Sequence, residues 1–327
     1  MASLIEVKGL KTYFYTYRGV VHAVDGADFS IESEKALCVV GESGCGKSVT
    51  ALSIMGLIEK PGKLESGEIL YHRNGSVTDL SKLDPEGEVY RSIRGREISM
   101  IFQEPMISLN PVYTIGNQIM EAIILHQKVG KKEARMRALA MLKAVGVSLP
   151  SQRIDEYPHQ LSGGMRQRAM IAMAISCNPK LLIADEPTTA LDVTVEAQVL
   201  SLIRDLRKEF KMALMLITHD LGVVANMADE VIIMYLGKIV EKSNVKNIFH
   251  NTKHPYTQGL MNSIPSLTTT KKDRLIPIAG NVPDPLIALS GCCFESRCPQ
   301  KTAICKGEIP PLKQVAPGHQ VACWLYN

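Results

Sequence analysis

No stretch of the sequence is apolar over the roughly 18 residues that a membrane-spanning helix needs. The start of the chain, residues 1–10, also lacks the charged and apolar regions of a signal peptide. An excess of one charge is missing as well, since the formal net charge is +4 and 21% of the residues are charged. Together these absences predict a cytosolic protein, and the small positive charge gives no reason to expect a nucleic-acid partner.

The eight cysteines include no tight C-x-x-C pair, which is the spacing usual in structural zinc sites. Five of them nevertheless gather after residue 290. In a cytosolic chain such a cluster indicates a metal before it indicates disulfides. Four of the five are separated by five, six and seventeen residues: Cys292, Cys298, Cys305 and Cys323. Four thiolates can hold zinc or an iron–sulfur cluster, and free thiols are the third possibility.

Residues 41–48, Gly-Glu-Ser-Gly-Cys-Gly-Lys-Ser, fit the phosphate-loop pattern G-x-x-x-x-G-K-[ST]. Apolar residues 36–40 indicate a buried strand before the loop, and helical spacing follows over 48–58, which is the context that the pattern needs. Glycines let successive backbone N–H groups face one phosphate, and the helix adds its positive N-terminal end. Lys47 can reach the outer phosphates, and the Ser48 hydroxyl can hold Mg²⁺.

A length of 327 residues exceeds what one compact core usually supports, so we expect two or more lobes. Short apolar runs alternate with helical patterns, which predicts an α/β fold with a doubly wound, mostly parallel sheet and a small β-rich entry before the phosphate loop. The predicted strands are 5–14, 27–31, 36–40, 66–71, 98–102, 181–184, 213–218, 231–235 and 238–241, and the predicted helices of the core are 48–58, 164–177, 195–209 and 221–227.

Residues 107–156 carry no strand signal, while 115–126 and 132–145 place apolar residues three and four positions apart. We therefore predict a helical subdomain, about residues 104–160, inserted into the α/β core. Beyond residue 250 the chain becomes richer in proline and turns and loses its periodicity. The predicted domains are a nucleotide-binding domain over 1–250 and an irregular C-terminal metal-binding extension over 251–327.

Two carboxylates, Asp185 and Glu186, end the apolar strand 181–184. Asp185 is placed to hold Mg²⁺ directly or through water, and Glu186 is the candidate to polarise an attacking water. Phosphoryl transfer needs these parts, namely a phosphate cradle, a metal site and a positioned nucleophile. Gln103 and His219 follow two other predicted strands, at the sheet edge where ligands of α/β proteins bind.

Residues 161–164, Leu-Ser-Gly-Gly, open a helix and form a second possible anion site. The chain thus has two helix N-termini that could bind phosphate, although only one of them belongs to a complete nucleotide-binding motif. We therefore expect a dimer, in which the second site of one chain closes on the nucleotide of the other.

These motifs resemble the ATPase subunit of an ABC transporter, over about residues 3–245. The phosphate loop, Gln103, residues 161–164, Asp185-Glu186, Ala190-Leu191-Asp192 and His219 occur in the family's order and spacing. The resemblance implies a P-loop NTPase core and a head-to-tail ATP sandwich. In that sandwich Ser162 and Gly164 contact the γ-phosphate held by the partner's phosphate loop.

The resemblance also implies roles for single residues. His219 would sense the γ-phosphate, Asp192 would couple the two sites, and Gln103 would link magnesium and water to the membrane subunits. Catalysis would rest on Glu186, His219 and Gln103, and Mg²⁺ would be held by Ser48, Gln103 and Asp185. The implied nucleotide-binding set is Phe14 (or Tyr13) for adenine, then Gly41, Ser43, Gly44, Cys45, Gly46, Lys47, Ser48, Val49, Ser162, Gly163, Gly164 and Asp192. Two residues depart from the family pattern: Met165, where glutamine is common, and Cys45, where serine is common.

A closer resemblance, to the oligopeptide/dipeptide importer branch that also includes nickel importers, lies in residues 41–44, 103–111 and 254–257 and in the cysteine-rich tail. It implies a four-iron–four-sulfur (4Fe–4S) cluster on Cys292, Cys298, Cys305 and Cys323, with zinc as the alternative. Cys293 is then the predicted bystander.

The implied function is ATP hydrolysis that energises import of dipeptides or oligopeptides, with nickel or another small solute as the alternative. The implied partners are two transmembrane permease subunits, a second homologous ATPase in a head-to-tail heterodimer and, indirectly, an extracytoplasmic solute-binding protein. The chain would act at the cytoplasmic face of the membrane. A soluble ABC ATPase acting on DNA or ribosomes is disfavoured by the single cassette and short helical insert, and a redox sensor with a vestigial ATPase by the intact motif residues.

Overall fold

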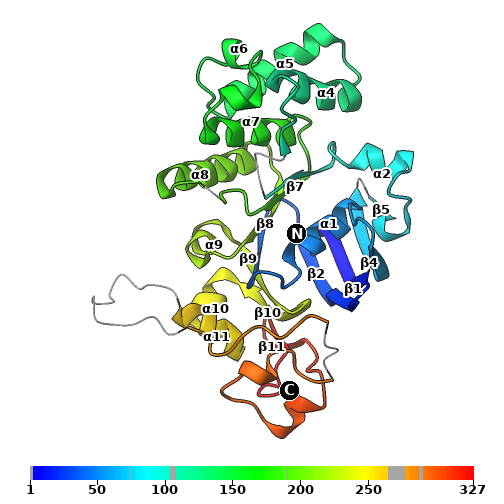
Figure 1. Ribbon diagram of the computed structural model, residues 1–327, viewed down its shortest axis with the longest axis vertical. Coiled ribbons are helices and arrows are strands. Elements are labelled where there is room, and N and C mark those ends of the chain that lie inside the picture. The colour runs from blue at the N-terminus through cyan, green and yellow to red at the C-terminus, as the bar shows by residue number, and fades with distance from the viewer. Residues whose placement is uncertain (1–2, 74, 104–107, 190, 264–276, 287–289) are drawn as a thin grey trace. The chain divides into compact units, whose positions relative to one another are not determined.

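The computed structural model describes residues 3–73, 75–103, 108–189, 191–263, 277–286 and 290–327 (Figure 1). The chain divides into two compact units, each of which is described by itself. The first comprises Met1–Leu4, Ile31–Lys35 and Lys82–Ile217, and the second comprises Ile5–Ser30, Ala36–Ser81 and Thr218–Asn327. The predicted domain boundary at residue 250 stays a prediction.

Parallel strands form the centre of the first unit: β6 (Ile98–Ile101), β7 (Leu181–Asp185) and β8 (Ala213–Thr218). Ile98 lies opposite Leu181, and Leu181 lies opposite Ala213, so the three strands begin in register. Every residue of these strands is buried, which explains why the sequence shows continuous apolar runs instead of alternation. Short helix α2 (Glu88–Ile93) precedes β6, and the long helix α8 (Val193–Glu209) follows β7.

The predicted helical subdomain is present in the same unit, as the green helices of Figure 1. Helices α4 (Ile115–Gln127) and α5 (Lys131–Ala144) pack against each other and against α7 (Gly163–Ile175). The hydroxyl of Thr114 caps α4 by accepting a hydrogen bond from the Asn117 N–H at 3.2 Å. Two short elements, α6 (Pro150–Arg153) and η2 (Pro158–Gln160), lead to α7.

The second unit contains an antiparallel sheet in the order β2-β1-β4-β5. Its strands are β1 (Ser3–Thr16), β2 (Gly19–Glu32), β4 (Gly62–Arg73) and β5 (Ser76–Asp79), and turn η1 (Leu80–Lys82) ends it. This is the predicted β-rich entry. The sequence did not predict β5, because a strand of four polar or exposed residues shows no apolar alternation.

The remaining strands of this unit all lie on one side of β3 (Ala36–Val40), which pairs in parallel with β9 (Glu230–Tyr235). Strand β10 (Lys238–Asn244) runs antiparallel to β9, β12 (His319–Val321) to β10, and β11 (Lys313–Ala316) to β12. The helices of the unit are α1 (Lys47–Met55), α9 (Leu221–Met227), α10 (Val245–His250) and α11 (Pro255–Asn262), with turns η3 (Glu295–Arg297) and η4 (Ala303–Lys306).

Two predictions need correction here. The extension is not wholly irregular, since β11 and β12 join β10, and α11 forms in its first part. Helix α1 ends at Met55 instead of residue 58, because Gly56 adopts the left-handed conformation and its N–H caps the carbonyls of Leu52 and Ser53. Among the described residues, no helix is long and apolar enough to cross a membrane.

Candidate functional site

The phosphate loop joins β3 to α1 and depends on two of its glycines. A Cβ atom on Gly41 would lie 2.3 Å from the carbonyl oxygen of Met234, and one on Gly46 would lie 2.1 Å from the carbonyl oxygen of Ala23. Gly46 also has φ +101°, a conformation that disfavours side chains. Of the remaining predicted residues, Ser43 and Gly44 are exposed at the loop, while Ser48 and Val49 lie in the first turn of α1.

Lys47 is buried at 6% exposure, although lysine is normally a surface residue. Its ammonium group donates to the carbonyl oxygens of Gly41 at 2.8 Å and Glu42 at 3.1 Å. Burial raises the pKa of the neighbouring Cys45 thiol, although the charge of Lys47 opposes the shift, so Cys45 is a neutral thiol at pH 7. The loop thus holds one fixed cation against its own backbone, which suits it to receive an anion.

Both rings that were predicted to stack on adenine, Tyr13 and Phe14, contact other parts of the second unit. The ring of Tyr13 stacks on His22 with centroids 4.1 Å apart, and its hydroxyl donates to the Asp25 carboxylate at 2.8 Å. Phe14 lies opposite Gly62 in β4, with its ring edge 2.6 Å from where a Gly62 Cβ would be. The choice between the two rings stays a prediction.

In the first unit, the structure brings Gln103 to Glu186. The Glu186 carboxylate accepts hydrogen bonds from the Gln103 side-chain amide at 3.1 Å and the Thr189 hydroxyl at 3.1 Å. Glu186 has φ +43°, and its N–H donates to the Ile217 carbonyl at 3.0 Å, so its backbone is fixed at the end of β7. Asp185, the last residue of β7, is 4% exposed. Two donors therefore orient the carboxylate that was predicted to polarise water.

The predicted second anion site is the start of α7. Ser162 is its N-cap, and its hydroxyl accepts a hydrogen bond from the Met165 N–H at 3.4 Å. Ser162 and Gly163 are exposed, and Gly164 is half-buried. Asp192 caps α8 in the same way, accepting from the Val195 N–H at 3.0 Å. Two stretches used in the predictions lie outside the described residues: 104–107 and Ala190.

His219 follows β8 and is exposed. The next residue, Asp220, caps α9 by accepting from the N–H groups of Gly222 at 2.6 Å and Val223 at 3.3 Å. The structure therefore places His219 at the carboxyl end of a strand, as the sequence predicted, and its sensing role stays a prediction.

The cysteines of the extension interact with one another. Burial raises the pKa of Cys323 to about 11, and the neighbouring thiols of Cys292, Cys298 and Cys305 contribute in the same direction. A hydrogen bond from the Cys293 thiol, helped by His254, lowers the pKa of Cys292 to about 5. Cys293 is buried and lies beside Cys292, and its role as a bystander to the predicted cluster stays a prediction. Within the described ranges, no three ligating side chains lie close enough to hold a single metal ion.

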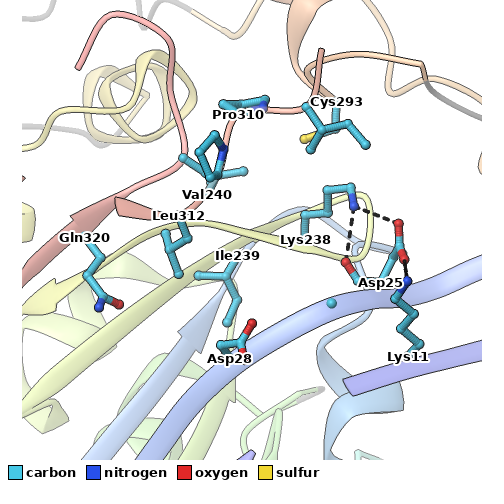
Figure 2. A pocket seen from close by; sticks show the side chains of 14 residues that line it. Lys11, Asp25, Asp28, Lys238, Ile239, Val240, Cys293, Pro310, Leu312 and Gln320 are labelled. Carbon is cyan, nitrogen blue, oxygen red and sulfur yellow. Dashed lines mark hydrogen bonds and ion pairs between the residues drawn. The ribbon is translucent and has the colours of Figure 1, made fainter. Parts of the chain in front are cut away.

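A pocket of about 490 Å³ lies between the entry strands and the extension (Figure 2). One wall is charged, because Lys238 donates to the Asp25 carboxylate at 2.7 Å and Lys11 lies 3.8 Å from it. Burial alone would raise the pKa of Asp25, but the hydrogen bonds from Lys238 and Tyr13 lower it. The opposite wall, residues 309–312, is apolar. Since both lysines pair with Asp25 and the Asp28 carboxylate accepts from the Gly9 N–H at 2.8 Å, the pocket points to no particular ligand.

Sequence reasoning gave no role to Glu42, which lies in the phosphate loop, or to Tyr256 and Arg297, which contact Glu42. Glu42 pairs with Arg297 at 2.7 Å, and its N–H donates to the Tyr256 hydroxyl at 3.0 Å. Each lies in one of the stretches that carry the closer resemblance, namely 41–44, 254–257 and the cysteine-rich tail. Their location in these stretches was the only indication in the sequence that the three residues are important, and it assigned no role to any one of them.

Comparison with known proteins gives matches over the whole chain. Residues 24–189 match the family described as ABC transporter, and residues 240–305 match the oligopeptide/dipeptide transporter C-terminal region. The oligopeptide transport ATP-binding protein AppD of Bacillus subtilis is 51% identical over 100% of this chain and 98% of its own length. The dipeptide transport ATP-binding protein DppD of Escherichia coli is 46% identical over 98% of this chain and 96% of its own length.

A solved structure of an ABC cassette is also similar. The dimeric structure of MJ0796, a bacterial ABC transporter cassette, aligns with a TM-score of 0.64 and 27% identity. The alignment covers 74% of this chain and 98% of that one. The described fold therefore agrees with that of an ATP-binding cassette.

Proposed function

The chain belongs to the ABC transporter family and to its oligopeptide/dipeptide branch, and from this membership we propose that it is the ATP-hydrolysing subunit of a peptide importer. The observation that carries the proposal is the fixed carboxylate of Glu186 in a chain that also has a complete phosphate loop. The imported solute is a dipeptide or oligopeptide, as for the named relatives. Nickel or another small solute is the alternative within the same family.

The chemistry follows from the described groups. Lys47 and the backbone of the phosphate loop bind the phosphates of ATP, and Glu186 accepts a proton from the attacking water. The Gln103 amide and the Thr189 hydroxyl hold the carboxylate in one orientation, which favours a single direction of attack. Ser48, Gln103 and Asp185 offer hydroxyl, amide and carboxylate oxygens, the donor set that Mg²⁺ prefers. Mg²⁺ held by these three residues, as the family resemblance implies, would neutralise charge on the phosphates.

The test replaces the proposed base without changing its size. We expect Glu186→Gln to lower ATP turnover by about 100-fold or more, because the amide cannot take the proton. ATP should then hold the variant in a closed dimer, which size-exclusion chromatography with ATP detects. Glu209→Gln, an exposed change near the end of α8, is the matched control and should turn over as the original chain does. Rapid turnover by Glu186→Gln would remove that role from Glu186.

The proposed assembly is a head-to-tail heterodimer with a second homologous ATPase, bound to two transmembrane permease subunits at the cytoplasmic face of the membrane. A solute-binding protein would deliver the peptide to the permeases and contact this chain only indirectly. The exposed start of α7 supports this assembly, because a phosphate-binding turn that faces outward can be used by a second chain. The soluble alternative, an ATPase acting on DNA or ribosomes, predicts no co-purification with membranes.

For the extension we propose a 4Fe–4S cluster on Cys292, Cys298, Cys305 and Cys323, with zinc as the alternative. The Cys292 N–H donates to the Cys305 carbonyl at 2.8 Å, and this proximity supports a shared site. Iron and sulfide of about four each per chain, after purification without oxygen, would support the cluster. Zinc, or no metal, would reduce the thiols to a structural role.

A further inference from the structure

We propose that Arg297, in the cysteine-rich part of the chain, positions the phosphate loop for nucleotide through a two-bond ion pair with Glu42. The inference rests on the proposed ATP site at residues 41–48, and it adds to this site a residue from the far end of the sequence. Glu42 is the second residue of the loop, and Arg297 lies 255 positions later, in turn η3.

The pair has the geometry of a strong interaction. Nη1 of Arg297 donates to Oε2 of Glu42 at 2.7 Å, and Nη2 donates to Oε1 at 3.1 Å. The side chain of Arg297 is 5% exposed and that of Glu42 is 28% exposed, so salt screens this pair less than a surface pair. Two parallel charge-assisted bonds fix direction as well as distance. Moving the loop away from the extension would leave a buried guanidinium without its carboxylate.

Arg297 is itself held in place, so it acts as the fixed partner. Its Nε donates to the Ala279 carbonyl at 3.1 Å, and Nη1 lies 3.3 Å from the Tyr235 hydroxyl. Its charge also sits over the rings of Tyr235 and Phe294, at 5.8 and 5.9 Å from their centroids. All of these contacts come from residues after β8. They orient the guanidinium whether or not Glu42 is present.

The same cluster also restrains the backbone of the loop. The Tyr256 hydroxyl accepts from the Glu42 N–H at 3.0 Å, and the ring of Tyr256 packs on Tyr235 and Phe294, with centroids 4.7 and 5.4 Å away. The Glu42 carbonyl in turn accepts from the ammonium group of Lys47 at 3.1 Å. Glu42 therefore connects Arg297 to the lysine that is proposed to meet the phosphates.

Such a connection works in both directions. If the extension orders the loop for nucleotide, then bound nucleotide must stabilise the extension by the same free energy. A pair that merely stabilises the fold would change the unfolding temperature without linking the two regions. This difference separates a positioning role from a structural one.

The first experiment is a double-mutant cycle on nucleotide affinity. Arg297→Ala, Glu42→Ala and the double variant are compared by titration with a fluorescent ATP analogue, well below the unfolding temperature of each. We expect each single change to weaken binding roughly tenfold and the double change to weaken it no further. Arg297→Lys, which keeps the charge but loses one bond, should fall between. Lys301→Ala is the control, because Lys301 pairs with Glu295 in the same segment and is 47% exposed.

The second readout is amide hydrogen exchange of residues 292–299. ATP should slow this exchange in the original chain and leave it unchanged in Arg297→Ala. Unaltered affinity in the single variants, or losses that simply add, would overturn the proposal. If Arg297→Ala does not fold, Arg297→Lys and Glu42→Gln complete the cycle.

The variant Lys47→Ala distinguishes a failure of the proposed ATP site from a failure of the proposed role of Arg297. If that variant binds ATP as well as the original chain, the proposed ATP site itself is wrong. If Lys47→Ala abolishes binding while the Arg297 variants bind normally, only the positioning role fails.

Discussion

The chain contains two helix starts suited to phosphate, and they are built in opposite ways. Helix α1 begins after Gly46, which has a positive φ and no side-chain cap, in a loop pressed against the carbonyls of Ala23 and Met234. Helix α7 begins at exposed Ser162, which caps the helix with its own hydroxyl, and nothing lies within 4 Å of a Cβ on Gly163. The N-terminus of α1 is therefore fixed by the backbone packed around it. The N-terminus of α7 is fixed by its own N-cap and is exposed.

The largest expected difference in stability comes from replacing one glycine by alanine at the N-terminus of each helix. Gly46→Ala should destabilise the chain by about 3 kcal/mol, because the new Cβ meets a backbone carbonyl and the residue is left with a positive φ. Gly163→Ala should change the free energy of unfolding by less than about 0.5 kcal/mol, since its Cβ points into open space. Thermal unfolding of the two variants measures the contrast. Equal losses would show that α7 is as constrained as α1.

A smaller effect is expected from Ser162→Ala. Loss of an N-cap costs about 1 kcal/mol, so stability should fall only slightly. ATPase activity of the assembled transporter should fall about tenfold, because the hydroxyl is proposed to contact the partner's nucleotide. Thr114→Ala, which removes the corresponding cap of α4, is the matched control and should lose stability without losing activity. A similar loss of activity in both variants would reduce Ser162 to a helix cap.

The smallest expected change is in the rate at which two buried thiols near the two helices are modified. Burial raises the pKa of Cys45 beside α1 and also that of Cys177, just beyond the end of α7. Both thiols are therefore neutral at pH 7, and iodoacetamide should modify them slowly, with rates that rise as the pH increases toward each pKa. ATP should slow only the modification of Cys45, and complete modification there should block nucleotide binding by steric bulk. Peptide mass spectrometry follows both sites, and full ATPase activity after stoichiometric modification of Cys45 would refute the steric effect.

Local patterns predicted the regular elements well and the pairing of distant residues not at all. The strands β3, β7 and β8 are continuous apolar runs, and their expected bounds differ from the observed ones by at most one residue. The short strands β11 and β12 were missed, because four and three residues are too few to show a period. The Arg297–Glu42 pair was missed for a different reason. A charge pattern says that a residue is charged, but it does not say which of many opposite charges it will meet.

The carboxylate of Glu241 shows what the C-terminal strands do for the rest of the unit. It is fully buried in β10 and accepts from the N–H groups of Lys253 and His254 and from the ring of His319, which lies at 2.7 Å in β12. The end of the chain thus covers what would otherwise be an open edge of the sheet that contains β3. An uncovered edge is a template for pairing with other chains. Deleting β12 would therefore leave β10 as an unpaired edge strand and remove the histidine that pairs with the Glu241 carboxylate. Loss of transport in such a deletion would then reflect aggregation of the protein.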